Sequence, residues 1–287
     1  MDADPSHTSF DMHWAIDPAT AAGMDTAALR ANFLIERLFE PGKILLSYTH
    51  YDRMVVGGAM PVGGSPLPLT AIKPMGTKSF LERRELLIVN VGADGIVNAD
   101  GQTHYLQNRD MLYLGMGTQS VEFQSGTDAS PAKFYLLSAP AHMKHANRLL
   151  TIKGAKRLDL GTPEACNKRS IFQFIHPEAE VRTCQLVAGI TMFAPGSVWN
   201  TMPAHVHDRR MEAYLYFDLP ETARVFHMMG EPQETRHIIV ANEQAVLSPA
   251  WSIHSGVGTA SYTFVWAMAG DNVDYTDIDP VPVESLR

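Results

Sequence analysis

The sequence has few cysteines, few positive charges and no long apolar stretch. Only Cys166 and Cys184 occur among 287 residues, and without a C-x-x-C spacing they indicate neither a disulfide framework nor a thiolate metal site. No run of Lys and Arg exceeds two residues, and the formal net charge is −8. This disfavours nucleic acids and anionic membranes as partners, since both require a basic surface. An acidic small molecule remains compatible, because one local arginine is enough to hold a carboxylate.

The longest apolar runs, at residues 86–89 and 264–268, are far shorter than the ~20 residues that span a bilayer. Residues 1–5 are acidic and polar, which does not fit a signal peptide. We therefore expect a cytoplasmic protein whose two cysteines are reduced.

Glycine and proline are abundant, at 21 and 18 residues, and they divide the chain into short segments. One helix is predicted near the start, capped by Asp25 or Thr26 and ended by Pro41-Gly42. Residues 141–150 fit a second short helix. The remaining pattern predicts short strands and therefore an all-β sandwich or barrel; the clearest strands are residues 44–48, 86–91, 111–114, 134–137, 170–175, 185–193, 213–217, 224–228, 238–240 and 262–268.

The two halves of the chain repeat a weak pattern. Arg83-Arg84 precedes the strand at 86–91 as Arg209-Arg210 precedes the strand at 213–217. Two barrels of common ancestry explain this repeat, and chance similarity between strand-rich stretches is the alternative. The predicted division is an N-terminal arm and helix at 1–45, one barrel at 46–152 and a second barrel at 153–287.

The stretch that carries chemistry contains His205, His207 and Glu212. Residues two apart on a strand share a face, so the two imidazoles lie side by side. Glu212 has the wrong parity for the same strand, so residues 208–210 must form a turn or bulge that brings it back on a neighbouring strand. Downstream, His254 lies between Pro249, which breaks a strand, and Gly256, which allows a tight turn. We expect a four-ligand site inside the second barrel.

Three histidines and one glutamate suit one divalent ion, namely zinc, manganese, iron, nickel or cobalt. An H-x-H pair alone is a weak signal in a chain with 12 histidines. The alternative is that two histidines are exposed and that His254 is an ordinary core residue. In the first half, Ser79, Leu81, Leu86 and Ser120 fall opposite the four ligands, so that barrel is expected to bind no metal.

These residues resemble the two-part motif of the cupins, which are small double-sheet β-barrels. Ser255-Gly256 replaces the usual asparagine region, and the spacing from Gly196 to His205 is longer than usual. Longer strings resemble the 5-dehydro-4-deoxy-D-glucuronate isomerase family, also called the 4-deoxy-L-threo-5-hexosulose-uronate ketol-isomerase family, over nearly the whole chain; they lie at residues 196–203, 207–212, 226–237 and 251–258.

The resemblance implies a bicupin with zinc on His205, His207, Glu212 and His254, in a cytoplasmic bacterial enzyme that is often a homohexamer. It implies conversion of the small uronate 5-dehydro-4-deoxy-D-glucuronate into 3-deoxy-D-glycero-2,5-hexodiulosonate during pectin degradation. Such a reaction moves a carbonyl between C1 and C2, and a metal with an open position stabilises the charge that develops on oxygen. Either a proton passes through an enediol or a hydride shifts directly, and the sequence is compatible with both.

A proton carrier must lie within hydrogen-bond reach of C1 and C2. The candidates are Tyr214, which shares the parity of Glu212, and Glu234 and His237 in the most distinctive string; Tyr216 has the same parity as Tyr214. A substrate carboxylate needs an arginine fork, and the candidates are Arg182, Arg209, Arg210, Arg224 and Arg236. For each residue, a structural or solvated surface role is the alternative.

Two other functions use the same kind of site. A cupin dioxygenase has the same ligand set with iron, copper or manganese, and metal analysis with oxygen uptake distinguishes it. A non-catalytic uronate-binding cupin would bind without turnover, and sugar-sensing members of that kind usually add a helix-turn-helix segment that is not evident here.

Overall fold

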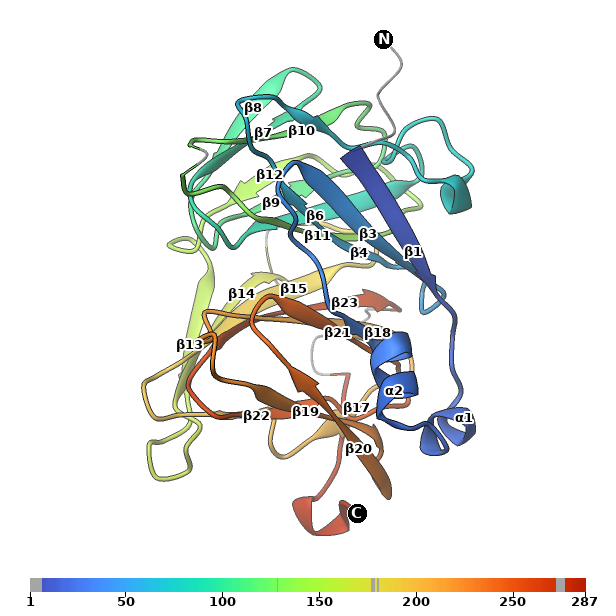
Figure 1. Ribbon diagram of the computed structural model, residues 1–287, viewed down its shortest axis with the longest axis vertical. Coiled ribbons are helices and arrows are strands. Elements are labelled where there is room, and N and C mark those ends of the chain that lie inside the picture. The colour runs from blue at the N-terminus through green and yellow to red at the C-terminus, as the bar shows by residue number, and fades with distance from the viewer. Residues whose placement is uncertain (1–6, 128, 177–178, 180, 272–276) are drawn as a thin grey trace. The chain divides into compact units, whose positions relative to one another are not determined.

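The computed structural model describes residues 7–127, 129–176, 179, 181–271 and 277–287. Its regular structure is almost entirely β-strand, and the chain divides into two compact units (Figure 1). The first unit contains the described residues of Met1–His13, Arg37–Ala155 and Glu178–Leu186. The second contains those of Trp14–Glu36, Lys156–Pro177 and Val187–Arg287. The all-β prediction is confirmed.

The first unit contains two sheets. The larger sheet has the strand order β1-β3-β4-β11-β6-β9-β12, with β1 at Thr8–His13, β3 at Lys43–Thr49, β4 at Val55–Met60, β11 at Phe134–Pro140, β6 at Arg84–Asn90, β9 at Met111–Leu114 and β12 at Arg148–Leu150. The smaller sheet has the order β5-β10-β7-β8, with β5 at Leu67–Pro68, β10 at Val121–Ser125, β7 at Gly95–Ala99 and β8 at Gln102–Leu106.

Apolar side chains fill the space between these two sheets. Leu86 and Ile88 of β6 and Phe134 of β11 pack in one buried cluster with Val97 of β7 and Phe123 of β10. Alternate residues of each strand point inward, so both sheets contribute to the same core. Leu86, which the repeat places opposite Glu212, is one of these core residues.

A buried carboxylate organises the last segment of the first unit. Glu85 of β6 is fully buried, and its Oε1 accepts hydrogen bonds from the backbone N–H groups of Gln185 and Leu186 at 2.7 and 3.0 Å. Its Oε2 accepts from the backbone N–H of Cys184 at 2.7 Å and from the Tyr113 hydroxyl at 2.8 Å. Charge-assisted bonds of this kind are the strong ones in proteins.

Replacing Glu85 by alanine is expected to lower the free energy of unfolding by about 3 kcal/mol or more, because it leaves several buried donors without an acceptor. The measurement is the urea midpoint followed by fluorescence. Glu284→Ala, which removes an exposed carboxylate, should change stability by less than about 0.5 kcal/mol. Equal effects of the two substitutions would contradict a structural role for the Glu85 contacts.

The second unit also contains two principal sheets. The larger has the order β13-β14-β15-β23-β18-β21-β2, with β13 at Lys156–Leu160, β14 at Arg169–Ile175, β15 at Val187–Phe193, β23 at Thr263–Gly270, β18 at Arg210–Phe217, β21 at Gln244–Ser248 and β2 at Leu34–Ile35. The smaller has the order β16-β22-β19-β20, with β16 at Trp199–Asn200, β22 at Ser255–Gly258, β19 at Val225–Glu231 and β20 at Glu234–Val240. A short pair joins β17 (His205–Val206) to β24 (Asp279–Pro280).

The two units share a strand order. The central strands β3-β4-β11-β6-β9 of the first unit correspond in sequence order to β14-β15-β23-β18-β21 of the second. The smaller sheets β5-β10-β7-β8 and β16-β22-β19-β20 correspond in the same way. The predicted internal repeat is therefore present as a repeated topology, and two cupin-like barrels are confirmed.

The N-terminal helix is shorter than predicted. Helix α2 spans Thr26–Phe33 and is capped by Asp25, whose carboxylate accepts from the backbone N–H of Ala28. Leu34 adopts an extended conformation and pairs with Val246 of β21, so tertiary pairing ends the helix well before Pro41. A further short helix, α1 (Pro18–Ala22), precedes it.

Three other local expectations were wrong. Residues 141–150 form no helix; their last three residues pair as β12 with β9, and the Asn147 side chain accepts from the backbone N–H of Gly115. The strand predicted to begin at residue 185 begins at Val187, since the preceding N–H groups bind Glu85. Gly256 lies within β22 rather than in a turn, and the turn is made earlier, between Pro249 and Ser252. Among the described residues, no helix is long and apolar enough to cross a membrane.

Candidate metal centre

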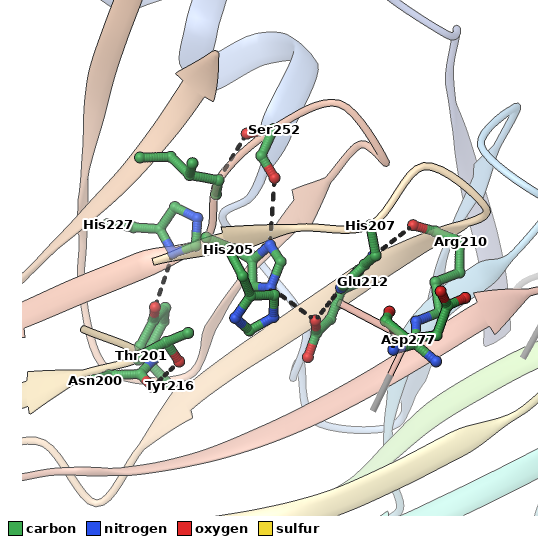
Figure 2. A network of polar contacts seen from close by, with 12 residues as sticks. Asn200, Thr201, His205, His207, Arg210, Glu212, Tyr216, His227, Ser252 and Asp277 are labelled. Carbon is green, nitrogen blue, oxygen red and sulfur yellow. Dashed lines mark hydrogen bonds and ion pairs between the residues drawn. The ribbon is translucent and has the colours of Figure 1, made fainter. Parts of the chain in front are cut away.

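The four predicted ligands come from three neighbouring segments of the second unit. His205 begins β17, and His207 follows this short strand directly. A turn at residues 208–209 leads into β18, whose inner face carries Glu212. His254 stands immediately before β22. Figure 2 shows the side chains of His205, His207 and Glu212 directed toward one another.

The donor atoms of these four residues all lie within 4.8 Å of one another. The Nε2 atoms of His205 and His254 are 2.9 Å apart. Those of His207 and His254 each lie 3.2 Å from Oε2 of Glu212. Such close approach of several lone-pair donors around one carboxylate is the arrangement that a divalent cation stabilises.

Backbone carbonyl groups orient two of the imidazoles. Nδ1 of His207 lies 3.0 Å from the carbonyl oxygen of Arg210 (Figure 2). Nδ1 of His254 lies 3.3 Å from the carbonyl oxygen of Ser252. With the ring proton on Nδ1 and donated outward, the lone pair of Nε2 faces the cluster. This outer contact is typical of metal-ligating histidines, so the residues fit a bound metal ion.

Burial and mutual contact prepare the protonation states of the ligands. Burial lowers the pKa of His205 to about 4, and it holds the pKa of His254 well below its usual value. Burial alone would raise the pKa of Glu212, but the neighbouring His254, His207 and His205 lower it to about 2. Glu212 is therefore ionised at neutral pH, while His205 and His254 are neutral. Metal binding requires these states.

The same shifts predict that the metal-free protein loses stability as the pH falls below 6.5. The unfolded chain binds protons at His205 and His227 from about pH 6.5, whereas burial lowers the folded pKa values to about 4 and about 3. These two histidines therefore leave the free energy of unfolding unchanged above pH 6.5 and lower it as the pH falls further. We expect a loss of about 2 kcal/mol per histidine between pH 6.5 and 5, measured as urea midpoints in chelator. An unchanged midpoint would contradict these protonation states.

A cavity of about 320 Å³ opens beside the cluster. His205 and Glu212 form part of its wall, so two of the ligands face it directly. Its other lining residues are Arg169, Ile171, Thr191, Asn200, Thr201, Met202, Pro203, Arg210, Tyr214, Phe264, Trp266, Met268 and Ile278. A small polar molecule could therefore reach the cluster while it contacts both charged and aromatic side chains.

One wall of this cavity depends on a glycine. Trp266 pairs with Gly189 across β23 and β15, and its indole N–H donates to the Thr191 hydroxyl at 3.2 Å. A Cβ atom at residue 189 would lie 2.2 Å from the Trp266 ring. The absence of a side chain at Gly189 therefore allows the indole to lie flat against the sheet.

Of the predicted proton carriers, the structure places Tyr214 on the cavity wall. Glu234 and His237 lie on β20 with exposed side chains, and neither belongs to the cavity lining. Tyr216 is fully buried outside the cavity lining, and its hydroxyl lies within hydrogen-bond distance of Nδ1 of His227, at 2.8 Å.

Four of the predicted carboxylate-binding arginines lie outside the cavity lining. Arg182 belongs to the first unit, Arg209 pairs with Asp277, Arg224 donates to the carbonyl of Glu221, and Arg236 pairs with Glu234.

Arg210 does line the cavity. Arg169 and Asn200 line it as well, although they were not identified from the sequence. The one sequence signal for Arg169 is its spacing of two residues from Ile171 on β14, which places both side chains on the same face of the sheet.

The fold and the site together define a bicupin whose second barrel, among the residues that the structure describes, holds a candidate metal centre. Among solved structures, an IolB-like protein from Salmonella typhimurium LT2 superposes with a TM-score of 0.71 at 17% identity, covering 87% of this chain and 97% of that chain. The oxalate decarboxylase of Lactobacillus farciminis gives a TM-score of 0.54 at 10% identity, covering 79% of each chain. These similarities support the fold alone.

Residues 45–281 match the model of the KduI/IolB family, and the chain belongs to that family. The 4-deoxy-L-threo-5-hexosulose-uronate ketol-isomerase 2 of Rhizobium meliloti (strain 1021) is 64% identical, covering 98% of this chain and 99% of the relative. The ketol-isomerase of the same name from Caldicellulosiruptor bescii is 52% identical, covering 96% and 100%. The predicted family and the predicted enzyme class, an isomerase, are confirmed.

Proposed function

We propose that this protein is a metal-dependent ketol-isomerase that converts 5-dehydro-4-deoxy-D-glucuronate into 3-deoxy-D-glycero-2,5-hexodiulosonate in pectin degradation. The observation that carries the proposal is the convergence of three imidazole nitrogens and one carboxylate at the wall of a cavity. The names of relatives that match nearly the whole chain support the choice of substrate.

His205, His207, Glu212 and His254 would hold one divalent ion, with zinc as the proposed metal. The bound ion supplies Lewis-acid polarisation of the substrate carbonyl and stabilises charge that develops on oxygen. The protein would contribute His205, His254 and Glu212 in the protonation states that metal binding requires, with His207 and His254 oriented by backbone carbonyls.

Tyr214 is the proposed proton carrier between C2 and C1. Its side chain lies on the cavity wall, and its ring centroid is 5.6 Å from that of His254. Among the lining residues named above it carries the phenolic hydroxyl, which gives up a proton more readily than the alcohol groups of Thr191 and Thr201. The Tyr214 hydroxyl would hold the proton close to the two carbons that exchange their oxidation states.

The direct test mixes purified protein with 5-dehydro-4-deoxy-D-glucuronate and follows isomerisation by NMR, with and without chelator. We expect turnover that is lost with the metal and restored by zinc. Turnover that survives complete metal removal would refute the metal-dependent proposal. Oxygen uptake with a redox metal would favour the dioxygenase alternative, and saturable uronate binding without turnover would favour the non-catalytic one.

Two further expectations from the resemblance stay proposals, namely assembly into a homohexamer and a cytoplasmic location. Light scattering of the purified protein measures the first, and cell fractionation measures the second.

A further inference from the structure

A buried arginine lies on the cavity wall beside the proposed metal ligands. Arg210 is 1% exposed, and it lines the same cavity as Glu212 and Tyr214. These three residues alternate along β18, so their side chains share the inner face of the sheet. Burying a positive charge is costly unless hydrogen bonds or an opposite charge offset that cost.

The spacing along β18 matches the length of a hexuronate. Arg210 and Glu212 are two residues apart, which is about 7 Å along a strand. The first carbon and the carboxylate carbon of an extended six-carbon chain are about 6 Å apart, at roughly 1.3 Å per bond. We infer that Arg210 binds the substrate carboxylate while C1 and C2 lie at the metal centre. This inference rests on the proposed function.

Neighbouring groups hold the Arg210 guanidinium in place. Its Nη2 donates to the main-chain carbonyl oxygen of Asp277 at 3.0 Å. The Asp277 carboxylate accepts a hydrogen bond from Nε of Arg209 at 3.0 Å and forms an ion pair with the Arg209 guanidinium. A planar guanidinium positioned in this way suits a carboxylate, which it can bind through two parallel hydrogen bonds.

The first unit shows what the corresponding arginine does without a metal cluster. Arg84 begins β6 as Arg210 begins β18, and it is also buried. Its Nε donates to the Ser138 hydroxyl at 3.0 Å, and its Nη2 donates to the carbonyl oxygens of Ser138 and Arg53, both at 2.7 Å. That guanidinium therefore ties together three segments of the fold.

Among its described residues, the second unit lacks a counterpart of the Ser138 hydroxyl, which accepts the hydrogen bond from Arg84 in the first unit. Ser138 pairs with Leu86, and the residue that pairs with Glu212 at the corresponding point is Met268. Met268 has no hydroxyl group, and its side chain lines the cavity. Methionine at the position of this serine is consistent with an arginine that stabilises the fold in the first unit and binds a ligand in the second.

Arg169 is the other arginine in the cavity lining. It lies on β14, which is separated from β18 by β15 and β23. Three strand spacings place its backbone about 14 Å from that of β18, whereas Arg210 lies on the strand that carries Glu212. The geometry therefore favours Arg210 as the carboxylate site.

The test compares binding of D-galacturonate and D-galactose to the zinc-loaded protein by calorimetry, because the two sugars differ in the carboxylate. Wild-type protein should bind galacturonate at least about 10-fold more tightly. Arg210→Gln should remove this preference and raise KM for the proposed uronate substrate about 10- to 100-fold, with one metal ion per chain retained. Arg210→Lys, which keeps the charge without the planar fork, should recover part of the preference.

Arg157→Gln serves as the matched control, because it removes an exposed arginine that is paired with Asp159. It should retain the full preference. Loss of the preference in Arg169→Gln but not in Arg210→Gln would overturn the assignment, as would equal binding of both sugars by the wild type. If Arg210→Gln does not fold, the Arg210→Lys and wild-type measurements decide the question. A wild type that prefers galacturonate but turns over no uronate would refute the proposed function instead.

Discussion

Replacing His254 by alanine is expected to abolish both metal binding and isomerase activity. The His254 ring is fully buried, and its Nε2 lies about 3 Å from both His205 and Glu212. Without this ligand, three donors remain around an enlarged space that water can enter. A Lewis acid contributes several kcal/mol to the transition state, so kcat/KM should fall at least about 1,000-fold.

The measurements are metal content by mass spectrometry and initial rates at saturating zinc. His142→Ala, which removes an exposed histidine of the first unit, should leave both unchanged. A His254→Ala variant that retains one tightly bound ion and ordinary turnover would mean that His254 is not a ligand.

The second large effect is expected for Tyr214→Phe, which removes a single hydroxyl from the cavity wall. If that hydroxyl carries the proton between C2 and C1, kcat should fall about 100- to 1,000-fold. Metal content and KM should change little, since the aromatic ring remains against His254 and Phe264.

Tyr216→Phe is the matched control, since it removes the same group from the next inward-facing position of β18. The Tyr216 hydroxyl is bound to His227 and lies outside the cavity lining, so this variant should lose about 1 kcal/mol of stability but little turnover. Reaction in deuterium oxide adds a second readout, because proton transfer through a side chain introduces solvent deuterium into the product. Complete retention of the original hydrogen would identify a hydride shift and exclude this role for Tyr214.

The clustering of His205, His207, Glu212 and His254 could be predicted because most of its geometry is local. Strand parity places His205 beside His207, and the turn at residues 208–209 returns Glu212 to the same point. His254 required an assumption about a distant segment; Pro249, where the chain does turn, supported it, whereas Gly256 lies within β22. The repeat of Arg83-Arg84 and Arg209-Arg210 likewise reflects a topology that local patterns preserve.

The remaining parts depend on packing between distant strands. Arg169 reaches the cavity from β14 and Asn200 from β16, and no local pattern relates these positions to β18. Helix α2 ends at Phe33 because Leu34 finds a partner in β21, which is a contact more than 200 residues along the chain. Glu234 and His237 lie in a conspicuous string, yet a distinctive sequence does not show which way a strand faces.

The glycine opposite Trp266 has a consequence for substrate size. Because a methyl group at position 189 would collide with the indole, the ring would have to shift off the β-sheet and narrow the space available to a sugar. Gly189→Ala should therefore select against longer or branched uronates before it affects catalysis of a short one. A single hydrogen atom in place of a side chain would thus help to determine which sugars the proposed active site can admit.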